Sequence, residues 1–424
     1  MIFSRGFTYA VLNGLVLFVR ACSALIINKL VVVTLGSSGL LLLGNLKNIV
    51  SILQQISGAG VYEGIVKYTA DTSKSRMSHV LQSGLTLMLV GFALAMLLYG
   101  VFSSKIFEIL TINTAQNALK IWLTVGMLIS LICFVLHTLF QSFFHGKMEY
   151  RIVVLSTAIS VALTLGISLI IIYYFGTLGV IVSVLLPAIM LLFSYLFFTS
   201  KIRQFVAGFR QTKFRLTMVK PLVSYTLMSA LAAVVFPSVF IYLRTFLAAN
   251  LSLEMAAYWE GYSKLSLFIS GLAISSISLY YLPKLTQATS VLEIRQVIFW
   301  GLKFMMLLGV PFLVLLFIFG NQLIPLLYDE DFLQTLFLLK WEVLGTLFKL
   351  FSFVISFLMI AKKMTKTFVL SELFSGLLFL TLSLVLIRCF GLEGASMAYA
   401  FTYFLYLIWA ILFFNKKFKF FAKN

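Results

Sequence analysis

Basic residues inside apolar runs of membrane-spanning length are the most informative feature of this sequence; they are Arg20, Lys47, Arg244 and Lys264. Arg20, for example, lies near the middle of the apolar run 7–33. A Lys or Arg at the centre of a membrane helix costs roughly 2.5–3.5 kcal/mol, so it persists where it meets a watery cavity, an opposite charge or an anionic ligand. The chain has 32 Lys and Arg residues but only 13 Asp and Glu residues, too few to pair with all of them. We therefore predict a basic internal cavity and an anionic cargo.

The composition is that of a membrane protein. Hydrophobic residues make up 62% of the chain and charged residues 11%, and the mean hydropathy of +1.08 excludes an ordinary soluble globule. A run of about twenty apolar residues can cross the ~30 Å hydrocarbon core of a bilayer. We expect an all-α polytopic membrane protein of about twelve transmembrane helices, at 7–33, 39–66, 78–102, 118–144, 152–175, 178–200, 221–247, 255–283, 297–320, 335–361, 367–390 and 395–414.

The net charge of +19 would suggest nucleic-acid binding in a soluble protein, but its distribution indicates another role. Most basic residues fall in alternate connections between the expected helices, starting with the N-terminus, and the connection 201–220 alone holds six. The opposite connections hold few, chiefly Lys105 and Arg388, together with the acidic run 329–331. Because basic loops stay in the cytoplasm, we expect both termini to be cytoplasmic and the charge to set the topology. No nucleic acid is expected as a partner.

The connection 201–220 divides the chain into two sets of six expected helices. We expect an N-terminal six-helix bundle at 1–200 and a C-terminal six-helix bundle at 221–424. The connection itself mixes aromatic and basic residues, a pattern typical of a helix that lies at the membrane interface. We therefore predict a cytoplasmic basic linker helix at 201–220.

The two halves also share a sequence pattern. A shift of 217 positions places three residues of the first half on residues of the same type in the second: Gly44 on Gly261, Lys47 on Lys264 and Lys67 on Lys284. Since each half has an even number of expected helices, both halves enter the membrane from the cytoplasm and form a parallel repeat. Transporters built from repeats bind substrate at the repeat interface and alternate access by rocking the halves.

Five basic residues are candidates for contact with an anionic cargo: Arg20, Lys29, Lys47, Arg244 and Lys264. For Lys29 and Arg244 the alternative is that the long side chain reaches the nearby interface. For the other three the alternative is an internal ion pair. Glu260 lies four residues before Lys264 on the same helical face, so these two charges can neutralise each other.

Three membrane carboxylates, Glu260, Glu342 and Glu372, are candidates for binding a coupling ion, H⁺ or Na⁺, with structural ion pairing as the alternative. We predict no catalytic residue, no metal site and no other cofactor. The histidines His79, His137 and His145 lack metal-ligand spacing and are expected to be polar packing residues. The acidic run 329–331 is expected to be a solvated loop, and the three cysteines to be free thiols.

Several short motifs resemble a known family. The segments 35–40 (LGSSGL), 44–45 (GN), 57–60 (SGAG) and 67–68 (KY) are similar to the first two spans of Wzx-type lipid-linked oligosaccharide flippases. The segments 258–261 (YWEG) and 281–285 (YLPKL) resemble the matching region around the eighth span. The likeness is greatest to the enterobacterial common antigen branch. This family belongs to the MOP superfamily, which also contains the MATE multidrug transporters.

The resemblance implies two six-helix bundles of the MATE-like (MOP) fold with a central cavity between them. It also implies an alternating-access flippase of the bacterial inner membrane. The cargo would be an undecaprenyl-diphosphate-linked oligosaccharide of the enterobacterial common antigen or O-antigen (lipopolysaccharide) type, moved from the cytoplasmic to the periplasmic leaflet. Expected partners are this cargo, membrane lipids and, as candidates, a polysaccharide polymerase and a chain-length regulator. A diphosphate suits the basic cavity, since Arg offers phosphate a planar fork of donors and Lys a point charge.

Two other functions are alternatives to a lipid-linked oligosaccharide flippase. A cation-coupled multidrug exporter of the same superfamily would need carboxylates in the cavity, whereas these apolar runs are richer in Lys and Arg. A membrane polysaccharide polymerase or glycosyltransferase would need a catalytic group on a substantial outer loop or a metal motif. The connections are short, so we expect a transporter and not an enzyme. Amide side chains such as Asn45, Asn48 and Gln54 could contact sugar hydroxyls or bond neighbouring helices.

Overall fold

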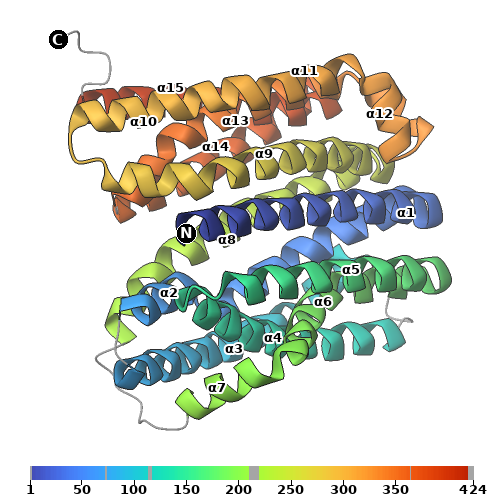
Figure 1. The fold of residues 1–424 in the computed structure, drawn as a ribbon. Helices are drawn as coiled ribbons and strands as arrows, with labels where there is room; N and C mark the ends of the chain where they lie inside the picture. The colour runs from blue at the N-terminus through green and yellow to red at the C-terminus, as the bar shows by residue number, and fades with distance from the viewer. Residues whose placement is uncertain (1, 72–73, 113–116, 210–218, 363, 419–424) are drawn as a thin grey trace. The chain divides into compact units, whose positions relative to one another are not determined.

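The computed structural model describes residues 2–71, 74–112, 117–209, 219–362 and 364–418, and every regular element in these ranges is helical (Figure 1). The chain separates into two compact units, Met1–Ile241 and Tyr242–Asn424, which we describe in turn. The helices of the first unit are α1 (Ile2–Gly58), α2 (Tyr62–Asp71), α3 (Lys74–Ile109), α4 (Asn117–Gly146), α5 (Tyr150–Phe175), α6 (Thr177–Ser194), the 3₁₀ turn η1 (Tyr195–Phe198), α7 (Thr199–Phe209) and the first part of α8 (Val219–Asn250).

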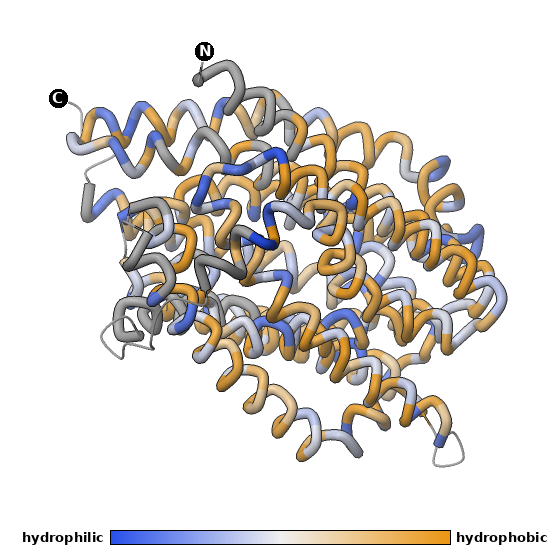
Figure 2. The backbone as a smooth tube through the Cα atoms, turned by 60° about the horizontal axis from the view of Figure 1, so that its bottom comes forward, coloured by the Kyte–Doolittle hydropathy of each residue, from blue (hydrophilic) through white to orange (hydrophobic). Residues whose placement is uncertain are grey.

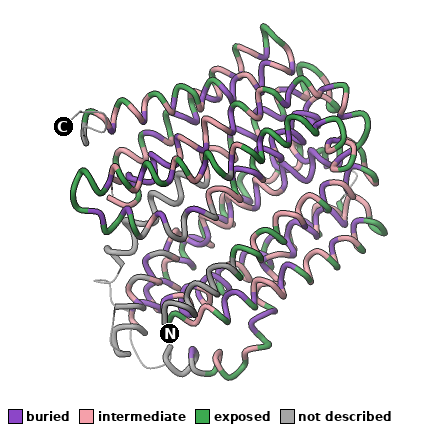
Figure 3. Tube along the Cα trace, turned by 45° about the horizontal axis from the view of Figure 1, so that its top comes forward, coloured by how far each residue is buried: buried purple, intermediate pink, exposed green. Residues whose placement is uncertain are grey.

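The second unit begins within α8 and contains seven more α-helices and two shorter elements. Its helices are α9 (Leu253–Gln287), α10 (Val291–Phe304), α11 (Val310–Ile318), α12 (Gly320–Leu327), α13 (Leu338–Ala361), α14 (Thr365–Phe390) and α15 (Leu392–Phe418). A π-helix (Met305–Gly309) joins α10 to α11, and a 3₁₀ helix (Glu330–Thr335) precedes α13. Long apolar stretches of helix carry large exposed side chains such as Leu97 and Leu377, as expected for surfaces that face lipid. Figure 2 colours the backbone by hydropathy and Figure 3 by burial, and hydrophobic and exposed positions occur along most of the helices.

Nine stretches of the described residues are long and apolar enough to span a membrane: Gly14–Gly58, His79–Ile109, Asn117–Gly146, Tyr150–Phe175, Thr177–Arg203, Val291–Ile318, Leu338–Ala361, Thr365–Phe390 and Leu392–Lys416. The all-helical, multi-pass prediction is therefore confirmed. The first stretch covers two of the expected spans, and α8 and α9 coincide with two further ones. The count of about twelve membrane crossings stays a prediction.

The first two expected spans form one helix element with a sharp kink. Gly36, inside α1, has φ 65° and ψ −156°, a conformation that glycine adopts at little cost because it lacks Cβ. The kink separates two arms, and Figure 1 draws them running in opposite directions. The second arm ends at Gly58, before position 66 where the apolar run ends, because Ala59 and Gly60 both have positive φ and break the helix.

The linker helix predicted at 201–220 coincides in part with α7, which packs against α3. Its Phe205 ring lies 4.9 Å from Phe140 and 5.0 Å from Phe143, measured between centroids, within a buried apolar cluster of the first unit. Lys201 Nζ lies 2.8 Å from Glu149 Oε1, at the start of α5. These contacts attach α7 to the helices of its own unit; residues 210–218 lie outside the described residues.

A helical motif occurs once in each unit. The ends of α4, α5 and the start of α6 recur 215 positions later as the ends of α13, α14 and the start of α15. Gly176 ends α5 with φ +50° and Gly391 ends α14 with φ +59°, as these left-handed positions require. Three residues later, Gly179 and Gly394 each meet the backbone of the preceding helix, so a larger side chain would separate the two helices. The two halves are therefore structural repeats over this region.

Candidate functional site

The first unit contains a cavity of about 480 Å³ between α1, α4, α5 and α6. Both arms of α1 contribute a cation to its lining, Arg20 from the first arm and Lys47 from the second. The kink at Gly36 allows these two residues, 27 positions apart, to reach one space. The remaining lining residues are Ser23, Ala24, Ile27, Val50, Ser51, Gln54, Phe134, His137, Gln141, Thr157, Ser160, Val161, Thr164, Leu165, Ser183, Val184, Pro187, Ala188 and Leu191.

The cavity carries positive charge without a carboxylate in its lining. Among the side chains of the first unit that the structure describes, the carboxylates are Glu108 and Glu149, and neither lines the cavity. Arg20 is exposed and Lys47 half-buried. A guanidinium and an ammonium at one polar space form a site suited to an anion with several oxygens, because each can donate charge-assisted hydrogen bonds.

Three cavity hydroxyls, those of Ser23, Thr157 and Ser183, already donate to their own helix. Thr157 Oγ1 donates to Val153 O and Ser183 Oγ to Val180 O, each at 2.8 Å. These bonds use the hydroxyl proton and leave the oxygen lone pairs available as acceptors. With Gln54, Gln141 and His137, the cavity therefore offers both neutral donors and neutral acceptors beside its cations.

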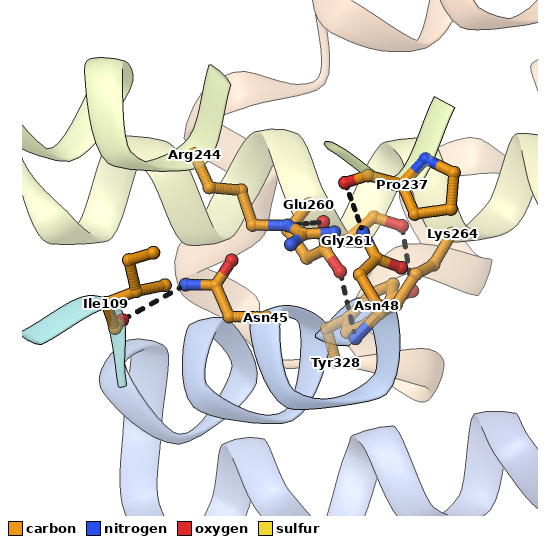
Figure 4. A network of polar contacts seen from close by, with 9 residues as sticks. All are labelled: Asn45, Asn48, Ile109, Pro237, Arg244, Glu260, Gly261, Lys264 and Tyr328. Atoms are coloured by element: carbon orange, nitrogen blue, oxygen red, sulfur yellow. Dashed lines mark hydrogen bonds and ion pairs between the residues drawn. The ribbon is translucent and has the colours of Figure 1, made fainter. Parts of the chain in front are cut away.

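Three other predicted polar residues of α1 do not line this cavity. Lys29 is half-buried on the first arm. Asn45 Nδ2 donates to Ile109 O and Asn48 Nδ2 to Pro237 O, both at 3.4 Å (Figure 4). The two asparagines thus bond neighbouring helices, which was one of the two alternatives for these amides.

In the second unit, two predicted cations share one carboxylate (Figure 4). Arg244 Nε of α8 lies 2.5 Å from Glu260 Oε2, and Lys264 Nζ lies 3.3 Å from Glu260 Oε1. The side chains of Arg244 and Glu260 are each 3% exposed and that of Lys264 13%. Arg244 therefore does not reach the surface. The triad carries one surplus positive charge.

The triad lacks a counterpart in the first unit. The shift of 217 positions that pairs Lys47 with Lys264 pairs Leu43 with Glu260. One helical turn before Lys47, the first half therefore has an apolar side chain where the second half has the carboxylate that binds two cations.

A second polar cluster lies in the second unit around α13. Glu342 accepts hydrogen bonds from Ser266 Oγ of α9 at 2.5 Å and from Ser396 Oγ of α15 at 2.8 Å. Two turns along α13, Lys349 Nζ lies 5.8 Å from the ring centre of Tyr399 and 5.3 Å from that of Tyr403. These are cation–π distances, which stabilise a cation away from water.

Glu372 of α14, the third candidate for ion coupling, lies within electrostatic range of Lys349 but not within ion-pair distance. Glu260, the remaining candidate for ion coupling, is already bound by Arg244 and Lys264. Glu342, which is buried, and Glu372, which is half-buried, thus belong to one cluster around Lys349 that sequence spacing did not reveal, because its members come from four helices.

The helical repeat relates this cluster to the cavity of the first unit. At an offset of 215 positions, four cavity residues correspond to four residues of the cluster: Thr157 to Glu372, Val184 to Tyr399, Ala188 to Tyr403 and Leu191 to Tyr406. At these positions the second unit has a glutamate and three tyrosines, where the first unit has a threonine and three aliphatic side chains.

Other chemistry is not evident in the described part of the chain. No group of three or more His, Cys, Asp or Glu residues there could hold a metal ion, and Cys22, Cys133 and Cys389 are free. Asp329 caps the 3₁₀ helix that follows by accepting a hydrogen bond from Glu330 N. His145 Nδ1 hydrogen-bonds Tyr62 Oη at 2.8 Å.

Comparison with known proteins gives both relatives and structural neighbours. No protein-family model matches the chain. The lipid III flippase of Escherichia coli (strain K12) is 25% identical over 392 residues, which cover 92% of this chain and 93% of that protein. The lipid III flippase of Shigella flexneri matches with the same figures. The chain is a distant homologue of these flippases, and since they are not enzymes the prediction of a non-enzyme is confirmed.

Solved structures identify the fold. An inward-facing multidrug resistance MATE family transporter of the MOP superfamily superposes with a TM-score of 0.77 at 12% identity, covering 97% of this chain and 94% of that one. The lipid II flippase MurJ in an inward closed conformation gives a TM-score of 0.68 at 15% identity, covering 99% and 89%. The chain therefore has the fold of MATE and MOP transporters, as the sequence motifs predicted.

Proposed function

We propose that this protein is a flippase that moves an undecaprenyl-diphosphate-linked oligosaccharide, of the enterobacterial common antigen or O-antigen type, across the bacterial inner membrane. The direction is from the cytoplasmic to the periplasmic leaflet, by alternating access of two six-helix bundles whose termini are both cytoplasmic. The homology to lipid III flippases supports the cargo class. The observation that carries the proposal is the cavity lined by Arg20 and Lys47, with no described carboxylate in its lining.

The charge of the cavity matches the part that such cargoes have in common. A diphosphate is a compact double anion, and it cannot cross hydrocarbon without compensation of its charge. The Arg20 guanidinium can bind two phosphate oxygens at once, and the Lys47 ammonium adds a point charge. The oligosaccharide varies between cargoes, whereas the diphosphate does not, so these cations serve any cargo of the class.

The cations of the second unit have a secondary role in this proposal. Arg244 and Lys264 share Glu260, so their triad contributes a single surplus charge to the field that attracts the cargo. Lys29 contributes in the same indirect way. An exporter of cationic drugs is disfavoured, because a cationic ligand would meet repulsion from Arg20 and Lys47 and no compensating carboxylate in the cavity lining.

The experiment is a transport and binding assay with the full-length protein in proteoliposomes. Arg20→Gln and Lys47→Gln should each weaken binding of the lipid-linked cargo by about 10- to 150-fold, which corresponds to the ~1.5–3 kcal/mol of a hydrogen bond to a charged group. Both should insert normally, since removing a membrane charge favours insertion. Arg20→Lys should retain part of the affinity, because the charge stays and the fork is lost.

Lys105→Gln is the matched control, because Lys105 is an exposed cation outside the cavity lining. It should leave binding and transport unchanged. Normal expression with full transport in both the Arg20 and the Lys47 variants would refute the anion-cavity proposal.

A further inference from the structure

Two buried polar atoms at the cavity, Nδ1 of His137 and Oγ1 of Thr164, have no hydrogen-bond partner among the described residues. His137, on α4, is only 6% exposed, and Thr164 lies on α5. Both residues line the cavity, but the two atoms themselves have less than 1 Å² of accessible surface, so a ligand in the cavity reaches them only after their side chains rotate toward it. Buried polar atoms nearly always have a partner, so each of these two calls for one that the protein itself does not supply.

The two atoms belong to the uncharged part of the cavity lining. The cations of the cavity, Arg20 and Lys47, both come from α1, whereas α4, α5 and α6 contribute only uncharged lining residues. A neutral imidazole presents one donor and one acceptor nitrogen, and a threonine hydroxyl is both donor and acceptor. Such a combination of hydrogen-bond donors and acceptors suits a neutral polyhydroxyl group, whose hydroxyls also donate and accept hydrogen bonds.

In the second unit, positions equivalent to some of the cavity residues are occupied by polar side chains that contact one another. There, the chain's own side chains satisfy one another: Ser356 Oγ donates to Tyr406 Oη at 3.2 Å, and Tyr406 Oη donates to Ser371 Oγ at 3.4 Å. In the first unit the position of Tyr406 is Leu191 and that of Tyr403 is Ala188, and a cavity remains. A ligand can thus supply in the first unit the polar groups that tyrosines supply in the second.

We propose that the wall of the cavity formed by α4, α5 and α6 is the subsite for the sugar joined directly to the diphosphate, and that His137 and Thr164 determine specificity by hydrogen-bonding its hydroxyl or amide groups. This rests on the proposed function, which places the diphosphate at Arg20 and Lys47. The cavity volume of about 480 Å³ lies in the ~300–1,000 Å³ range of small-molecule sites. It suits one sugar with its diphosphate, not a whole oligosaccharide.

The test compares two kinds of probe on the purified full-length protein in lipid nanodiscs. One is farnesyl diphosphate, and the other is farnesyl diphosphate joined to a single sugar, from a panel of glucose, galactose, N-acetylglucosamine and N-acetylgalactosamine. The wild type should bind at least one glycosylated probe about tenfold more tightly than the bare diphosphate, since a site built to hydrogen-bond a ligand group rejects the analogue that lacks it.

The variants separate the sugar subsite from the diphosphate subsite. His137→Phe and Thr164→Val should remove the preference for the sugar while keeping the affinity for farnesyl diphosphate within about twofold. The conservative Thr164→Ser should retain the preference, because it keeps the hydroxyl. Arg20→Gln should weaken both kinds of probe by the same factor. Ser168→Ala is the matched control: its hydroxyl is also buried on α5 and has no partner in the part of the chain that the structure describes, but it lies outside the cavity lining.

Each outcome distinguishes the inference from the proposed function. If no sugar improves binding to the wild type, or if the His137 and Thr164 variants keep the preference, the sugar subsite is wrong. Equal losses in Thr164→Val and Ser168→Ala would also overturn it, because the effect would then come from helix packing. If farnesyl diphosphate binds and Arg20→Gln abolishes its binding, the proposed function stands whatever the sugar results. If the wild type binds neither probe, the proposed function itself fails.

Discussion

Removing the carboxylate at Glu260 is the most direct test of the electrostatics in the second unit. Glu260→Gln keeps the size of the side chain but deletes the negative charge that Arg244 and Lys264 share at 2.5 and 3.3 Å. Arg244 is 3% exposed, so its guanidinium cannot reach solvent in the folded unit. Breaking a buried ion pair on one side costs about 3–5 kcal/mol, because the remaining charge is left buried without compensation.

The structure also predicts an order of effects within the triad. Lys264→Met should cost much less than Glu260→Gln, since Glu260 keeps its contact with Arg244 and no charge is left unpaired. The triple variant Glu260→Met, Arg244→Met and Lys264→Met should recover most of the loss, because replacing every member of a buried charge cluster by apolar residues of similar size is often close to neutral. This order follows from the geometry and would not follow from side-chain volume.

The assay is denaturant-induced unfolding of the purified protein in detergent micelles. Glu393→Gln is the matched control, since Glu393 forms a 2.8 Å pair with Lys340 whose side chains are 31% and 48% exposed. An exposed pair contributes about 0–1 kcal/mol, so the control should change the free energy of unfolding little. If Glu260→Gln cost no more than Glu393→Gln, the triad would not be a buried charge cluster and the argument would fail.

Two further predictions concern coupling and topology. If Glu342 or Glu372 carries a coupling proton, its replacement by Gln should abolish the pH dependence of cargo transport in proteoliposomes while the protein stays folded; unchanged pH dependence in both variants would remove them from the mechanism. A cysteine introduced at Thr212 should stay unlabelled by an impermeant maleimide in intact cells whereas one at Glu330 should be labelled, because the distribution of basic residues predicts that 201–220 is cytoplasmic and 329–331 periplasmic. Labelling at Thr212 from outside would contradict this topology.

The sequence predicted the positions of most helices well, because length and hydropathy report directly on burial in a bilayer. The run 118–144 corresponds to Asn117–Gly146 and the run 367–390 to Thr365–Phe390. Hydropathy missed the breaks that depend on backbone conformation. The apolar run 39–66 continues through the left-handed positions at Ala59 and Gly60, and the run 297–320 hides a π-helix at Met305–Gly309. Neither feature changes the apolar pattern.

The candidate site was only partly predictable from the sequence. A charged residue in an apolar run is easy to recognise, but the sequence does not show which side chains from other helices it contacts. Arg20 and Lys47 were found as charges, and both line the cavity. The Glu260–Lys264 contact follows from their spacing of four, but Arg244 joins it from a different helix. His137 was expected to be a packing residue, and its unpartnered nitrogen becomes visible only when four helices are placed around it.

The two halves share one helical motif but differ in the charged and polar side chains that it carries. In the second unit the cations have partners close by: Glu260 holds Arg244 and Lys264, and the rings of Tyr399 and Tyr403 flank Lys349. In the first unit the positions equivalent to those tyrosines carry small side chains, and a carboxylate is missing where Leu43 replaces Glu260. A symmetric transporter of a neutral cargo would gain nothing from that difference. An anionic cargo would, because the cavity of the first unit is lined by two cations and by no described carboxylate, whereas in the second unit Glu260 binds both Arg244 and Lys264.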